Sequence, residues 1–143
     1  MAEVSKTVLI EHPVTRMYEL VIDVRKYPEF LPWCGGVEIF EESDEILEAK
    51  IHVKFKGLNH YFHTRNINIR PTSIEMNFVD GPFKKFHGSW KFTALRADAC
   101  KIEFHLNYEF ESMILEKIVG PVFHMIAGTF VEGFIKRADS LYG

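Results

Sequence analysis

The 143 residues are 47% hydrophobic, 14% aromatic and 26% charged, a balance typical of one globular domain and unlike that of a disordered or fibrous chain. Seventeen Lys and Arg residues against 20 Asp and Glu residues give a formal net charge of −3. The chain therefore lacks the overall basic excess of most nucleic-acid-binding proteins. We expect a single domain over residues 1–143, in which any contact with RNA is confined to a local basic patch.

Cysteine usage and the absence of targeting signals indicate a cytoplasmic protein. Cys34 and Cys100 lie far apart and form no CxxC pair, so both are predicted to be buried free thiols. No basic–apolar signal segment precedes the first structured residues. The most apolar stretch, 114–134, is interrupted by charged residues, glycine and proline, so no transmembrane segment is predicted.

The first third of the chain predicts a strand followed by two short helices. Residues 2–11 are rich in β-branched side chains and favour a strand. Pro13 suits the first position of a helix, and apolar residues recur at helical spacing over 14–22. A second, shorter helix is expected within 27–32, where two prolines prevent a long continuation.

From Val37 onward the period of the apolar residues changes to two, which is typical of half-buried strands. The connections between these strands are short, which favours antiparallel neighbours. The strands are expected at 47–55, 58–70, 73–79, 86–94 and 100–110. The alternation is least clear in 58–70, so which of its residues face the core stays open.

The last segment, 112–142, returns to helical spacing with one wide apolar stripe. Gly120-Pro121 is expected to kink or interrupt this helix, and Gly128 and Gly133 to give room for close approach or for a ligand. A curved sheet with one apolar face needs a cover, and this is the only long helix available. One helix does not fill so large a concave face, so an α+β domain with an apolar cavity is predicted.

Several segments are similar to a known family. They are Val21–Cys34, Asp80–Lys85, Gly88–Phe92, Cys100–Phe110 and Phe134–Gly143. In the same order and spacing they resemble the ribosome-association toxin and coenzyme Q-binding protein family, of the START-like (polyketide cyclase and lipid transport) superfamily. The resemblance implies the helix-grip fold: a curved antiparallel sheet of about six to seven strands around a long C-terminal helix, with two short helices after the first strand.

The resemblance implies two main functions. The first is non-catalytic binding of ubiquinone, or a similar isoprenoid lipid, in a tunnel between the sheet and the last helix, in support of respiration. Peripheral membrane contact for ligand exchange would accompany it, and no other cofactor is required. The alternative is a toxin that binds the large ribosomal subunit and blocks subunit joining. A cyclase-like enzyme of the same fold is a second alternative.

The candidate tunnel lining consists of large apolar and aromatic side chains predicted to face the space between sheet and helix. Each of them would serve equally well in an ordinary core, although Trp33 and Tyr108 add a polar group that a ligand carbonyl could contact. The candidates are Phe30, Trp33, Phe62, Phe78, Trp90, Phe104, Tyr108, Val119, Phe123, Ile126 and Phe130.

The candidate ribosome-binding surface consists of lysines on the polar faces of strands, namely Lys50, Lys54, Lys56 and Lys85, among glutamates that dilute their charge. The seven histidines show no metal-ligand spacing, and no nucleophile–base motif occurs. Neither a metal site nor a catalytic residue is therefore predicted.

Overall fold

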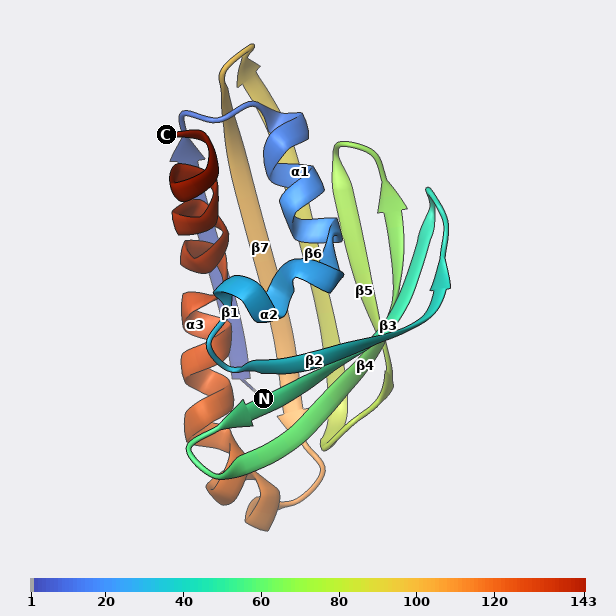
Figure 1. The fold of residues 1–143 in the computed structure, drawn as a ribbon. Helices are drawn as coiled ribbons and strands as arrows, with labels where there is room; N and C mark the ends of the chain where they lie inside the picture. Colours follow the sequence, from blue (N-terminus) through green and yellow to red (C-terminus); the bar gives the residue numbers. More distant parts are fainter. Residues whose placement is uncertain (1) are drawn as a thin grey trace.

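The structure, a computed structural model, describes residues 2–143 and confirms the predicted fold class (Figure 1). One seven-stranded antiparallel sheet packs against a long C-terminal helix, α3, and short helices follow the first strand. In chain order the elements are β1 (Ala2–Ile10), α1 (Val14–Ile22), the 3-10 helix η1 (Val24–Lys26), α2 (Tyr27–Phe30), β2 (Cys34–Glu42), β3 (Ile46–Phe55), β4 (Leu58–Ile69), β5 (Ser73–Asp80), β6 (Phe83–Arg96), β7 (Ala99–Phe110) and α3 (Met113–Tyr142).

The order of the strands in the sheet determines the course of the chain. That order is β1-β7-β6-β5-β4-β3-β2, so consecutive strands are neighbours from β2 to β7 and β1 joins the far side of β7. β1 and β2 therefore form opposite edges of the sheet. The connection between them, residues 11–33, crosses from one edge to the other and carries α1, η1 and α2 over the concave face (Figure 1).

Helix α3 lies on the same concave face and supplies much of the core (Figure 1). Its N-terminus is capped by Ser112, whose Oγ accepts a hydrogen bond from the backbone N–H of Leu115 at 3.2 Å. Of the predicted kink or interruption at Gly120-Pro121, the interruption is wrong, since α3 is continuous from Met113 to Tyr142, and the kink stays a prediction. Pro121 lies on the exposed side of the helix, where water can satisfy the carbonyl that loses its intrahelical partner.

By length and composition, α3 is also able to cross a membrane, whereas the sequence was expected to contain no transmembrane segment. The charged residues, glycine and proline of this segment do not break the helix, which runs through them. In the structure, 44% of its most apolar 18-residue stretch is buried against the rest of the molecule. A core helix passes the same length and composition test, so the finding is weak evidence for a membrane span.

The two glycines in the second half of α3 differ in their surroundings. A Cβ added at Gly133 would lie 2.7 Å from Cδ2 of Leu31, a buried residue of the connection between α2 and β2. A Cβ added at Gly128 would meet no atom within 4 Å. Gly133 therefore allows the connection to pack closely on α3, and a larger residue at Gly128 would block no tunnel.

We expect Gly128→Ala to raise the free energy of unfolding by about 1 kcal/mol, because alanine favours helix and its Cβ meets nothing. Gly133→Ala gains the same helix contribution but displaces Leu31, so we expect it to be less stable than Gly128→Ala by about 1 kcal/mol. Urea unfolding followed by circular dichroism measures both. Equal stabilities of the two variants would contradict the close packing of Leu31 on α3.

Candidate functional site

The structure brings the eleven predicted lining residues together in one layer between the sheet and the helices. Phe30 lies in α2 and Trp33 just after it, and the other aromatic residues come from β4, β5, β6, β7 and α3. All are buried except Phe30 and Phe78, which are half-buried. We call this set the aromatic layer. Its position agrees with the prediction, and its role in binding a ligand stays a prediction.

Ring contacts within the aromatic layer connect α3 to both the sheet and the α2 segment. The centroid of the Phe130 ring lies 5.7 Å from those of Trp90 and Phe104 and 5.9 Å from that of Trp33. The ring centroid of Phe123 lies 4.9 Å from that of Tyr108. These separations are within the range of favourable aromatic pairs, so the rings fill the layer by contacting one another.

The layer contains small hollows where the sequence predicts an open tunnel. Three hollows lie along it, with volumes of about 20, 10 and 20 Å³. Each is about the size of one water molecule. The difference arises because side-chain volume, which a pattern of apolar positions does not report, decides whether a concave face is filled. An isoprenoid chain would enter only if several rings moved.

A larger hollow, a groove of about 700 Å³, lies between the α2–β2 connection and α3 and shares Phe30 and Trp33 with the aromatic layer. Its apolar wall is formed by residues 30–33 together with Phe55 and Met125. Its rim is charged: the guanidinium of Arg137 lies 3.0 Å from the carboxylate of Glu29. This contact lowers the pKa of Glu29. The groove therefore offers an apolar surface with charges of both signs beside it.

Two polar contacts inside the molecule were not expected from the sequence. The Tyr27 hydroxyl donates to the backbone carbonyl of Val21, and the Tyr108 hydroxyl shares a hydrogen bond with Nδ1 of His124. Burial raises the pKa of Tyr27 and raises that of Tyr108 to about 12. His124 sits beside a second, open hollow of about 330 Å³ near the start of α3. No sequence signal marked His124, because a single histidine on a helix has no distinguishing spacing.

The predicted ribosome-binding lysines do not form one cluster. Lys50 and Lys54 lie on the outer face of β3, and Lys56 is in the β3–β4 turn. Lys85 lies on β6, which two strands separate from β3, a distance of roughly 14 Å. Within residues 2–143 none of these four ammonium groups forms an ion pair, although that of Lys50 lies 4.4 Å above the Tyr61 ring.

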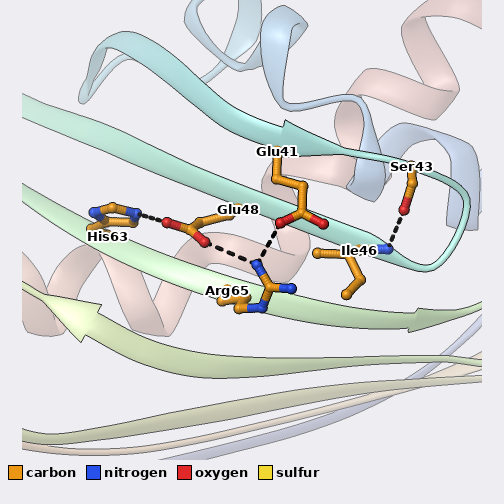
Figure 2. Close-up of polar contacts among 6 residues, drawn as sticks. All are labelled: Glu41, Ser43, Ile46, Glu48, His63 and Arg65. Atoms are coloured by element: carbon orange, nitrogen blue, oxygen red, sulfur yellow. Dashed lines mark hydrogen bonds and ion pairs between the residues drawn. The ribbon is translucent and has the colours of Figure 1, made fainter.

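Carboxylates balance the positive charge on the outer face of β2, β3 and β4 (Figure 2). Arg65 Nη1 lies 2.7 Å from Glu41 and 3.1 Å from Glu48, and Glu48 also contacts His63 Nε2 at 2.9 Å. The hydrogen bonds from His63 and Arg65 lower the pKa of Glu48. This part of the face is an ion-pair network, whereas Lys54 and Lys56, at the end of β3 and in its turn, are exposed.

The described residues offer little for nucleophilic or metal chemistry. In the 2–143 range no three His, Cys, Asp or Glu side chains are grouped so that they could hold a metal ion. Cys34 and Cys100 are buried free thiols, as predicted. Burial raises the pKa of both thiols, which makes them poor nucleophiles.

Comparison with known proteins places this geometry in a family. The family described as "Polyketide cyclase / dehydrase and lipid transport" matches residues 10–135. The "Ribosome association toxin RatA" of Escherichia coli K12 is 44% identical over 142 residues, which cover 99% of this chain and 90% of that protein. The mitochondrial "Coenzyme Q-binding protein COQ10 homolog B" of Xenopus laevis is 24% identical over 99% of this chain and 59% of that protein.

Solved structures agree on the fold. The ZhuI aromatase/cyclase from Streptomyces sp. R1128 superposes with a TM-score of 0.78 at 19% identity, over 96% of this chain and 93% of that one. At that identity the likeness shows the fold alone. The family match over most of the chain shows that the chain belongs to the polyketide cyclase / dehydrase and lipid transport family.

Proposed function

We propose that this protein associates with ribosomes as a toxin, which is the function in the name of its E. coli relative. The observation that carries the proposal is 44% identity over nearly the full length of both chains. In the mode implied by the resemblance, the protein binds the large subunit and blocks subunit joining. A cytoplasmic location follows from such a partner, and no catalytic step is required.

The structure supports a role for the outer surface in this function. The three hollows along the aromatic layer are water-sized, and a macromolecular partner is far too large for them, so it must contact the outside. Lys54 and Lys56 are exposed and without ion pairs among the described residues at the end of β3. Lysines of this kind attract phosphates by releasing counterions. A local basic site explains how a chain of net charge −3 binds ribosomal RNA.

We expect Lys54→Glu with Lys56→Glu to weaken co-sedimentation with 50S subunits by about tenfold at 0.1 M salt, because two phosphate contacts are lost and two repulsions are gained. The matched control is Lys91→Glu with Lys117→Glu, which changes the net charge equally at exposed positions on β6 and α3. If both double variants bound 50S subunits with equal affinity, the end of β3 would not be part of the interface. If the parent did not co-sediment with 50S subunits, the proposed ribosome association would be refuted.

A second candidate function is non-catalytic binding of a hydrophobic molecule, for which ubiquinone or a similar isoprenoid lipid is the proposed ligand. The specific observation is the groove of about 700 Å³, whose wall is formed by Phe30, Leu31, Pro32 and Trp33 of the segment that carries the family resemblance. The 24%-identical coenzyme Q-binding relative supports the ligand class. Exposed Ile114 and Ile118 on α3 offer an apolar surface for peripheral membrane contact during ligand exchange.

We expect decylubiquinone to quench the fluorescence of Trp33, and Met125→Lys to weaken that binding by about tenfold or more, because it places a charge on the apolar wall of the groove. The control is Met113→Lys, which makes the same substitution on an exposed part of α3 that does not line the groove. Similar loss in both variants would argue against the groove, and no quenching in the parent would argue against quinone binding.

A further inference from the structure

The second half of β4 has an inverted polarity. Ile67 and Ile69 point away from the core and are 40% and 61% exposed. Thr64, Asn66 and Asn68 alternate with them on the concave face, where Thr64 and Asn68 are only 3% and 6% exposed. A strand normally buries its apolar residues and exposes its polar ones. A shift of the pairing register by one residue would bury the isoleucines and expose the asparagines in this half of the strand. The observed register therefore needs an explanation.

This register is fixed by pairing with the neighbouring strands, which surround the polar side chains with apolar residues. Leu47 of β3 pairs with Asn66, and Ile74 of β5 pairs with Asn68. Both of these partners are buried. The asparagines are therefore kept inside by their position in the middle of the sheet, at a cost in stability, because polar groups in such surroundings lose their water. Violations of pattern of this kind concentrate at functional sites.

The three polar side chains line one of the water-sized hollows, here called the polar hollow. Its volume is about 20 Å³. The Oδ1 atoms of Asn66 and Asn68 are fully buried and have no hydrogen-bond partner among the described residues. No charged side chain of the 2–143 range lines it; its other walls are apolar and aromatic, with Val24, Tyr27, Trp90 and Phe130 among them.

We propose that the polar hollow binds the hydroxyl head of an otherwise apolar, uncharged molecule, such as a phenol or a quinol. The hydroxyl donates its one hydrogen to the side-chain carbonyl oxygen of Asn66 or of Asn68, and the apolar body extends along the aromatic layer, which Trp90 and Phe130 connect to the hollow. A carboxylate or phosphate head is excluded, since no countercharge lines the hollow. This inference rests on the second candidate function and specifies the chemistry of its ligand.

The connection formed by residues 11–33 provides a route by which such a ligand enters. Val21, Val24 and Tyr27 of the 11–33 connection form one wall of the polar hollow. The same connection forms a wall of the outer groove through Leu31 and Trp33. Displacement of this one segment would therefore enlarge the polar hollow and open it toward the groove, with no change in the pairing of the strands.

The test compares 4-propylphenol with propylbenzene, which share an apolar body and differ in one hydroxyl. We expect isothermal titration calorimetry to show that the phenol binds the parent about tenfold more tightly. In the variant Asn66→Leu/Asn68→Leu we expect equal affinities for the two compounds. We also expect a higher melting temperature for this variant without ligand, because unpaired buried polar groups are replaced by apolar ones.

Tyr18→Phe is the matched control. The Tyr18 hydroxyl is also buried and without a partner among the described residues, but Tyr18 does not line the polar hollow. We expect this variant to keep the preference for the phenol. Equal binding of the two compounds by the parent would overturn the inference about the polar hollow but leave binding of hydrophobic molecules in place. If the parent bound neither compound, both the inference and the second candidate function would be overturned. If the parent showed no preference for the phenol and the double leucine variant melted at a lower temperature than the parent, the polar hollow would be assigned to a structural water only.

Discussion

The packing of Phe130 against Trp33, Trp90 and Phe104 is the interaction on which the rest of the structure depends. Phe130 comes from α3, two of its partners from the sheet, and Trp33 from the connection that follows α2. One side chain thus joins all three parts of the molecule. Burying rings of this size is among the largest single contributions to a core, so anything that enters the interior must compete with these contacts.

The connection between β1 and β2 has a special position for a topological reason. Because its two strands are the opposite edges of the sheet, the connection must cross the concave face that α3 leaves uncovered. On one side it contacts α3 through Leu31 and Gly133, and the groove opens there. On the other side it closes the polar hollow over Asn66 and Asn68. The segment that completes the fold is therefore also the segment that lines both candidate ligand sites.

The sequence predicted the layers of the fold well and the details of the site less well. Alternation of apolar residues locates β3, β6 and β7 because both faces of these strands obey the usual polarity. Alternation did not show which residues of β4 face the core. Asn66 faces inward and Ile67 outward, the opposite of what their polarity favours, and this orientation is set by pairing with the neighbouring strands. The size of the predicted tunnel could not be derived for another reason: periodicity tells which face is apolar but not whether rings such as those of Phe123 and Phe130 fill the space beside it.

The two proposed functions meet at the end of β3. Phe55 forms part of the groove wall, and it lies between Lys54 and Lys56, which carry the proposed ribosome contact. A ligand in the groove and a partner on these lysines would share one short backbone segment. If each prefers a different arrangement of that segment, binding of one changes the affinity for the other by an equal factor, as linkage requires. Under that condition the two proposed functions, hydrophobic ligand binding and ribosome association, would be coupled through one surface and would not exclude each other.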